Sequence, residues 1–159
     1  MIRHTLLAAA AISAAVALPA CTDTTAPQQL ASGVSLAATF PRSGAFHVTK
    51  DCSTYTGHAD DICTITSSSL KEVAAGSRII YASDAVGASL DTDVRLDLPG
   101  PGHNAAFGHC TLSLATGIGA CELSGGAGKF TGFHASVAVS PLGGPDFAWD
   151  GTYSFSPND

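Results

Sequence analysis

The chain has little charge, and most of that charge is acidic. Only 13% of its 159 residues are charged, with 7 lysines and arginines against 13 aspartates and glutamates. No run of like charge is longer than Asp60-Asp61, and the basic residues are scattered. Because binding to nucleic acid needs a concentrated positive surface, the composition argues against nucleic acid as a partner.

Motifs for metal binding and catalysis are also missing. The cysteines lack C-x2-C spacing for zinc, and no two histidines have the spacing of paired ligands on a strand or helix. Histidines are therefore expected at the surface. Asp91, Asp93 and Asp97 would line one strand face about 7 Å apart for neighbours two residues apart, too far for one small ion, so we expect them in solvent.

Catalytic side chains are equally hard to find. No serine lies in a G-x-S-x-G elbow. The two glutamates, Glu72 and Glu122, are expected in a loop and on a wet strand face, not in the apolar setting that tunes a catalytic carboxylate. We identify no catalytic residue, no metal site and no cofactor.

The first residues have the features of a secretory signal. A positive start at Arg3 precedes an apolar run over residues 6–18, which is shorter than the roughly 20 residues of a membrane-spanning helix. Ala15-Val16-Ala17 fits ordinary cleavage, whereas Leu18-Pro19-Ala20-Cys21 resembles the lipobox of bacterial lipoproteins apart from its proline. Lipidation of Cys21 would leave four of the five cysteines, an even set for disulfides. We therefore favour a lipoprotein signal over residues 1–20, with a soluble secreted protein as the alternative.

The lipoprotein interpretation implies a membrane anchor at the bacterial cell envelope. Several acyl chains on Cys21 would hold the chain stably. Thr22 stands where an aspartate usually means retention at the inner membrane, so we expect the outer membrane. Residues 21–32 would be the lipidated N-terminus with a polar tether, and residues 33–159 the folded domain. The part after residue 20 has 6 basic and 13 acidic residues, and its 139 residues suit one domain.

The domain has the pattern of an antiparallel all-β fold. Turn signals recur at about every tenth residue. In residues 88–98, ASLDTDVRLDL, apolar and polar side chains alternate, which gives a strand one dry and one wet face. A helical turn, too short for a real helix, is plausible at residues 69–74. Eight to ten strands are predicted, at residues 34–40, 45–49, 62–67, 78–82, 88–98, 105–114, 120–124, 132–140 and 147–155. A barrel and a β-sandwich both fit this pattern.

The remaining four cysteines fall in two close pairs. Four cysteines allow three connectivities, but each close pair brackets a predicted turn. We therefore expect disulfides Cys52–Cys63 and Cys110–Cys121. The second would close a hairpin of about a dozen residues, which contributes about 2–3 kcal/mol of stability.

A glycine-rich stretch, SGGAGKFTG at residues 124–132, first suggests a phosphate-binding loop. A P-loop needs G-x-x-x-x-G-K followed by Ser or Thr, then a helix. Here Leu123 takes the place of the first glycine, Phe130 follows the lysine, and a predicted strand comes next. The glycines therefore suit a backbone connection between two strands, with Lys129 at the surface.

This stretch resembles the G-x-G-x-F-x-G connection of the allene oxide cyclase and dirigent-protein barrels, here Gly126 to Gly132. The resemblance extends to the preceding strand at residues 121–124 and to a closing W-D-G-x-Y strand at residues 149–153, so it covers roughly the last 55 residues. It implies an eight-stranded antiparallel barrel with an apolar cavity. The family's enzymes isomerise an unstable fatty-acid epoxide or steer radical coupling of phenols. Their catalytic groups cannot be placed on particular residues of this chain.

We therefore favour a non-catalytic binding or structural module, with a small apolar molecule as its candidate ligand. In a hollow barrel that ligand would contact an aromatic row that otherwise belongs to the core: Phe147, Trp149, Tyr153 and Phe155. One alternative is an isomerase or cyclase, which would need a cavity of at least about 300 Å³ with convergent polar groups. Another is an adhesion-type sandwich, which would have a disulfide between distant strands around a buried tryptophan.

Overall fold

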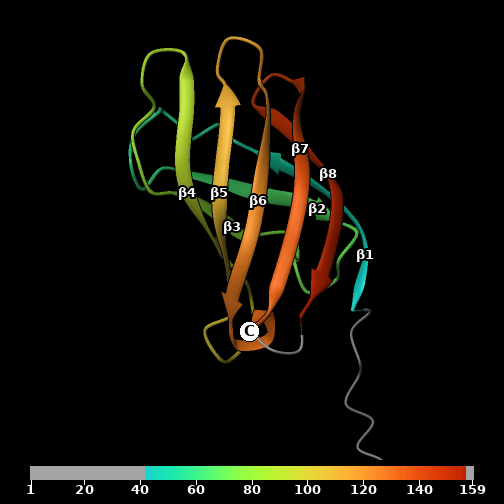
Figure 1. The fold of residues 1–159 in the computed structure, drawn as a ribbon. Coiled ribbons are helices and arrows are strands. Elements are labelled where there is room, and N and C mark those ends of the chain that lie inside the picture. The colour runs from blue at the N-terminus through green and yellow to red at the C-terminus, as the bar shows by residue number, and fades with distance from the viewer. Residues whose placement is uncertain (1–41, 157–159) are drawn as a thin grey trace, which may run out of the picture. The chain divides into compact units, whose positions relative to one another are not determined.

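A computed structural model describes residues 42–156, which form a closed, eight-stranded antiparallel barrel (Figure 1). Each strand pairs with the next, and β8 pairs with β1 over nine consecutive residue pairs. The strands are β1 (Ser43–Asp51), β2 (Ile62–Ser68), β3 (Arg78–Tyr81), β4 (Ser89–Asp97), β5 (Ala105–Ser113), β6 (Ile118–Ala127), β7 (Phe133–Gly143) and β8 (Asp146–Phe155). The predicted barrel is confirmed, and the sandwich is not formed.

Within residues 42–156, the predicted strands agree with the observed ones apart from the exact residues at which each strand begins and ends. Residues 1–41 lie outside the described part, and with them the signal peptide, Cys21, the tether and the strand predicted at residues 34–40. Residues 69–74 form a turn and no α-helix, closed by the Val73 N–H donating to the Leu70 carbonyl at 2.9 Å. Leu70 and Val73 are both buried, so the connection from β2 to β3 contributes two side chains to the hydrophobic core.

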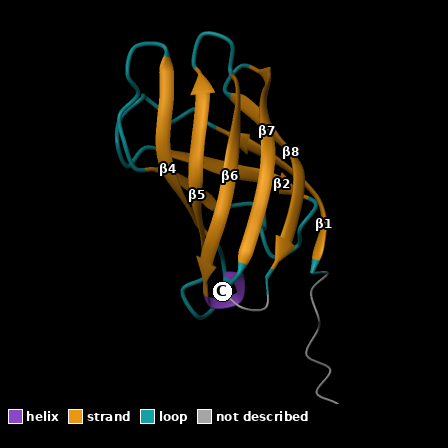
Figure 2. Ribbon diagram, viewed as in Figure 1, coloured by secondary structure: helices purple, strands orange, loops and turns teal. Residues whose placement is uncertain are grey.

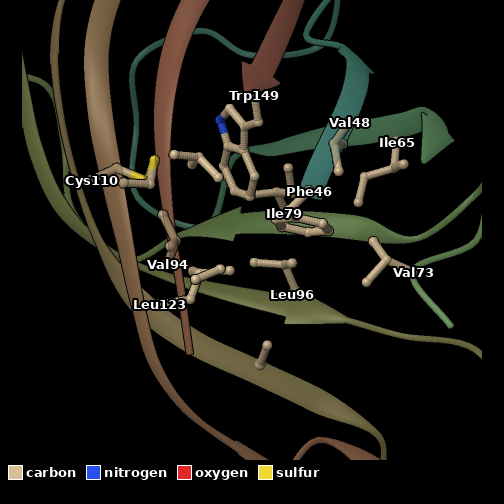
Figure 3. Close-up of a cluster of buried hydrophobic side chains, with 14 of the residues drawn as sticks. Phe46, Val48, Ile65, Val73, Ile79, Val94, Leu96, Cys110, Leu123 and Trp149 are labelled. Atoms are coloured by element: carbon tan, nitrogen blue, oxygen red, sulfur yellow. A yellow bond between two sulfur atoms is a disulfide. The ribbon is translucent and has the colours of Figure 1, made fainter. Parts of the chain in front are cut away.

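Alternation along the strands sends every second side chain into the barrel. On β4, Leu90, Thr92, Val94 and Leu96 are buried while Asp91, Asp93 and Arg95 are exposed, as the period-two pattern predicted. Figure 3 shows Trp149 and Phe46 among the aliphatic side chains of the core. Near the short 3-10 helix η1 (Gly128–Phe130) that follows β6 lies a cluster of aromatic rings with centroids 5.1–6.1 Å apart: Phe46, Phe130, Phe133, Tyr153 and Phe155. The barrel is therefore mostly filled by its own side chains.

The glycine-rich stretch is a tight corner between β6 and β7. Its centre is a short 3-10 helix, η1 (Gly128–Phe130), which places Phe130 in the core and Lys129 at the surface. Gly128 and Gly132 have φ of +63° and +73°, a region that favours glycine. A Cβ on Gly126 would collide with the Phe130 carbonyl oxygen. The prediction of a strand connection is confirmed.

Both predicted disulfides are present. Cys52 is bonded to Cys63 and Cys110 to Cys121, with Cα atoms 4.3 and 4.1 Å apart. Cys110 and Cys121 are direct partners in the β5–β6 ladder. The other bond ties the segment after β1 to the start of β2, so each bond joins neighbouring strands of the barrel.

Gly151 offers a test of this close packing. A Cβ there would collide with the Ser136 carbonyl oxygen of β7, so Gly151→Ala should lower the free energy of unfolding by about 1–3 kcal/mol in urea titrations. Gly125→Ala is the matched control, because a Cβ at Gly125 has no atom within 4 Å. Equal losses in the two variants would contradict the explanation.

Candidate functional site

A lysine occupies an inward position in this apolar barrel. On β1, Lys50 follows Phe46 and Val48 on the face that points inside, and it pairs with Phe147 of β8. The Lys50 residue is only 3% exposed, and it is the one buried residue with a charged side chain in residues 42–156. Burial of a charge is costly unless the charge is paired, so this position needs a physical account.

The lysine ammonium is surrounded by aromatic groups. Its Nζ donates a hydrogen bond of 2.7 Å to the Tyr81 hydroxyl and lies 4.6 Å from the centroid of the Trp149 ring. The rings of Tyr81 and Phe147 follow at 5.4 and 5.9 Å. Cation–π contacts of this kind stabilise a desolvated ammonium. No ion pair within the described range joins Lys50 to a carboxylate.

Burial changes the acid–base properties of this group. It lowers the pKa of Lys50 to about 7, because an ammonium loses hydration inside the barrel. Burial also raises the pKa of the Tyr81 hydroxyl, and Tyr55 adds a smaller contribution in the same direction. Near neutral pH, Lys50 is therefore divided between its charged and neutral forms while Tyr81 stays protonated.

A small cavity of about 40 Å³ lies beside the lysine. Its walls are mostly apolar and include the disulfide Cys52–Cys63 together with Lys50, Tyr55, Tyr81, Leu112, Leu114 and Phe147. The Tyr55 ring packs edge-on against Tyr81, with centroids 5.1 Å apart. The Tyr55 hydroxyl is buried and has no hydrogen-bond partner in the described structure. A buried lysine and an unpartnered phenol thus share one cavity.

Exposed apolar side chains gather at the same end of the barrel, where the exposed Asp84 and Asp146 also lie. Figure 2 shows the β3–β4, β5–β6 and β7–β8 connections at this end. Four of the five exposed large apolar side chains in the described range lie there, and we call them the apolar rim: Val86, Leu114, Ile118 and Leu142. Residues 113–119 and 138–145 contain no charged side chain. Leu114 is 39% exposed and also lines the cavity, so the cavity lies directly beneath the rim.

The predicted aromatic row is divided between two regions. Phe147 lines the cavity and Trp149 lies against Lys50, whereas Tyr153 and Phe155 belong to the distant aromatic cluster near η1. Sequence reasoning did not identify Lys50, Tyr55 or Tyr81. The alternation Phe46, Val48, Lys50, Cys52 was the available signal, because it places the lysine on the inward parity.

The surface histidine His109 bridges two aspartates. Its Nδ1 lies 2.9 Å from Asp93 Oδ1 and its Nε2 lies 2.8 Å from Asp91 Oδ1. Hydrogen bonding, first to Asp93, raises the pKa of this exposed imidazole. The aspartates face solvent as expected, but two of them are paired with His109. No group of three or more His, Cys, Asp or Glu residues in the described part is arranged to hold a metal ion.

A wider hollow of about 710 Å³ lies on the outside of the barrel, over β3, β4 and β5. It is lined by Arg78 and Arg95, and both guanidinium groups pair with Asp97, at 3.1 and 2.8 Å. Charges there are already matched by protein groups. We therefore place the candidate site at Lys50, where a buried charge has no acidic partner.

No protein-family model matches the chain, and no curated protein or solved structure shows significant similarity to it. Within residues 42–156, no helix has the length and apolar character needed to cross a membrane. The site must therefore be interpreted from its own chemistry.

The buried lysine predicts a pH dependence of stability. In the folded state its pKa is about 7, whereas the unfolded chain keeps the ordinary value near 10.5. Between these values the unfolded state binds more protons, so the free energy of unfolding should rise by about 1.4 kcal/mol per pH unit. Urea titrations of the wild type from pH 7 to 9.5, below the titration of the tyrosines, measure this slope.

Lys50→Met should remove the slope, because methionine keeps a straight apolar side chain without the titrating amine. Lys129→Met is the control, since Lys129 is an exposed residue of η1. A slope that persists in Lys50→Met would show that another group causes it.

Proposed function

We propose that the protein is a non-catalytic binding module, held at the bacterial cell envelope by a lipid on Cys21, that receives a small apolar molecule at the Lys50 end of its barrel. The observation that carries the proposal is the cavity beneath the apolar rim. Exposed apolar side chains that gather on one surface mark interaction sites. Here they lie in the connections at the end of the barrel that also contains a cavity.

The filled interior supports binding more than catalysis. Small-molecule pockets have volumes of about 300–1,000 Å³, whereas the Lys50 cavity has about 40 Å³. A fatty-acid epoxide or a pair of phenols does not fit inside such a space. A ligand would therefore rest mainly on the rim and insert only a small group, which favours recognition over an enclosed reaction.

A relationship to the allene oxide cyclase and dirigent barrels remains part of the proposal. It rests on the sequence motif at residues 126–132 and on the W-D-G-x-Y strand, and an eight-stranded barrel is compatible with it. An isomerase or cyclase activity would require a larger interior than the described one. Location at the outer membrane rests on Thr22 following Cys21.

Lipidation can be tested by metabolic labelling with an alkyne fatty acid in a bacterium that processes lipoproteins. The full chain should incorporate the label on Cys21, and mass spectrometry should find residue 21 as the modified N-terminus. Cys21→Ala should abolish the label. An N-terminus after Ala17 with no acyl group would show ordinary secretion and overturn the anchor.

Ligand binding can be tested with octan-1-ol, a neutral apolar probe, on the full chain carrying Cys21→Ala. Trp149 is the single tryptophan, so its fluorescence reports directly on the Lys50 end. We expect a saturable change, and an affinity at least about tenfold weaker in Leu114→Asp because a charge would enter the apolar wall.

Phe107→Asp is the matched control for Leu114→Asp. Phe107 is 42% exposed, close to the 39% of Leu114, but it lies over the outer hollow. Its replacement should leave octan-1-ol binding unchanged. Absence of a saturable signal in the wild type, or equal losses in both variants, would contradict a binding site at this end.

A further inference from the structure

The Lys50 cavity has a surplus of hydrogen-bond donors. A lysine ammonium carries three N–H donors and no acceptor, and one of them is used by the Tyr81 hydroxyl. Tyr55 also lines the cavity, and its hydroxyl is buried without a hydrogen-bond partner. An unpaired buried polar group is costly. The chemical complement of such a surface is a group that only accepts hydrogen bonds.

The electrostatics of the cavity favour a negative charge on that group. The titratable groups that face Lys50 are phenols, Tyr81 from β3 and Tyr55 from the β1–β2 loop. Cys63 of β2 is held in a disulfide, and the β8 neighbours are Phe147 and Trp149. No carboxylate in the described residues forms an ion pair with the lysine.

Acidic side chains do lie at this end of the barrel, with Asp51 next to Lys50 on β1 and Asp146 at the start of β8, but none forms an ion pair with the lysine. Asp61 and Asp84, in the loops before β2 and after β3, raise the pKa of Tyr55, behind its burial as the main cause. The Asp61 carboxylate already accepts hydrogen bonds from Thr56 and His58. Asp84 accepts a hydrogen bond from the Ala59 N–H. Neither carboxylate forms an ion pair with the Lys50 ammonium.

The walls around the donors suit a hydrocarbon tail. Leu112, Leu114 and Phe147 line the cavity, and the rest of the apolar rim continues from Leu114. The Leu114 N–H donates to the Ala88 carbonyl at 2.8 Å, which joins the β3–β4 and β5–β6 connections into one surface. A path without charged side chains therefore leads from the cavity to solvent across residues 113–119.

We propose that this cavity binds the carboxylate of a monoanionic apolar ligand, with its head against Lys50 and Tyr55 and its tail along Leu112, Leu114 and Phe147. The proposal rests on the proposed function and adds the charge and chemical class of the ligand. A carboxylate has two acceptor oxygens, which match the amine and the unpartnered phenol. Its size also matches a cavity that admits only a small group.

Three probes of equal length test the charge: octanoate, octan-1-ol and octylammonium. Binding is followed by Trp149 fluorescence at pH 6, on the full chain carrying Cys21→Ala. Octanoate should bind at least about tenfold more tightly than octan-1-ol, and octylammonium more weakly than either. Acetate should bind much more weakly than octanoate, because it lacks the tail.

Variants assign this preference to named groups. Lys50→Met should reduce octanoate affinity to about that of octan-1-ol and should weaken octan-1-ol much less, because the neutral hydroxyl loses a hydrogen bond but no charge pairing. Tyr55→Phe keeps the ring and removes one donor, so it should weaken octanoate several-fold and octan-1-ol by a smaller factor. Lys129→Met, at the surface of η1, should change neither ligand. The probe series in the wild type decides the question even if Lys50→Met fails to fold.

The pH dependence gives an independent readout. Because the pKa of free Lys50 is about 7, octanoate affinity should be constant between pH 5.5 and 6.5 and fall up to tenfold per pH unit above 7. Binding of octan-1-ol should show no such fall. In Lys50→Met the octanoate profile should be flat.

The outcomes separate this inference from the proposed function. If octan-1-ol binds at the Lys50 end and octanoate binds no better, the carboxylate site is wrong and the apolar binding module stands. If acetate matches octanoate, the tail assignment is wrong. If none of the probes changes Trp149 emission, the proposed function fails and the inference fails with it.

Discussion

The ladder between β1 and β8 is the constraint on which the structure depends. Nine consecutive residue pairs join the first described strand to the last and turn a sheet into a barrel without free edges. Closure also encloses a core, so the side chains on one face of each strand must pack within a limited volume. Close approach of the strands then excludes side chains at particular positions, such as Gly151 against Ser136.

The burial of Lys50 follows from this closure. In an open sheet its long side chain would reach solvent, whereas in the barrel it is held between β2, β3 and β8 and meets Tyr81 and Trp149. The surroundings supply π faces and a phenol in place of a carboxylate. Desolvation is therefore the main cause of its lowered pKa, and the amine remains available to an anionic group from outside the chain.

The sequence allowed much of the fold to be predicted. Alternation on β4, the turn residues between strands and the spacing of the cysteines depend on local backbone geometry, and they led to the strands and both disulfides. The short helical turn proposed at residues 69–74 agrees with the single turn found there, which is closed by the Val73 N–H and the Leu70 carbonyl and forms no helix. The candidate site was only half predicted, since Phe147 and Trp149 were named without the lysine beside them.

The sequence by itself determined the alternation of buried and exposed side chains, the glycine-rich connection between strands and the pairing of near-neighbour cysteines. Each of these features depends on residues that are close together along the chain. Tertiary structure decided between barrel and sandwich and brought Lys50, Tyr55 and Tyr81 together. These three residues lie on β1, a loop and β3, and their contacts depend on strand register and on closure. The lowered pKa of Lys50 has the same origin, because desolvation depends on what surrounds a group in space.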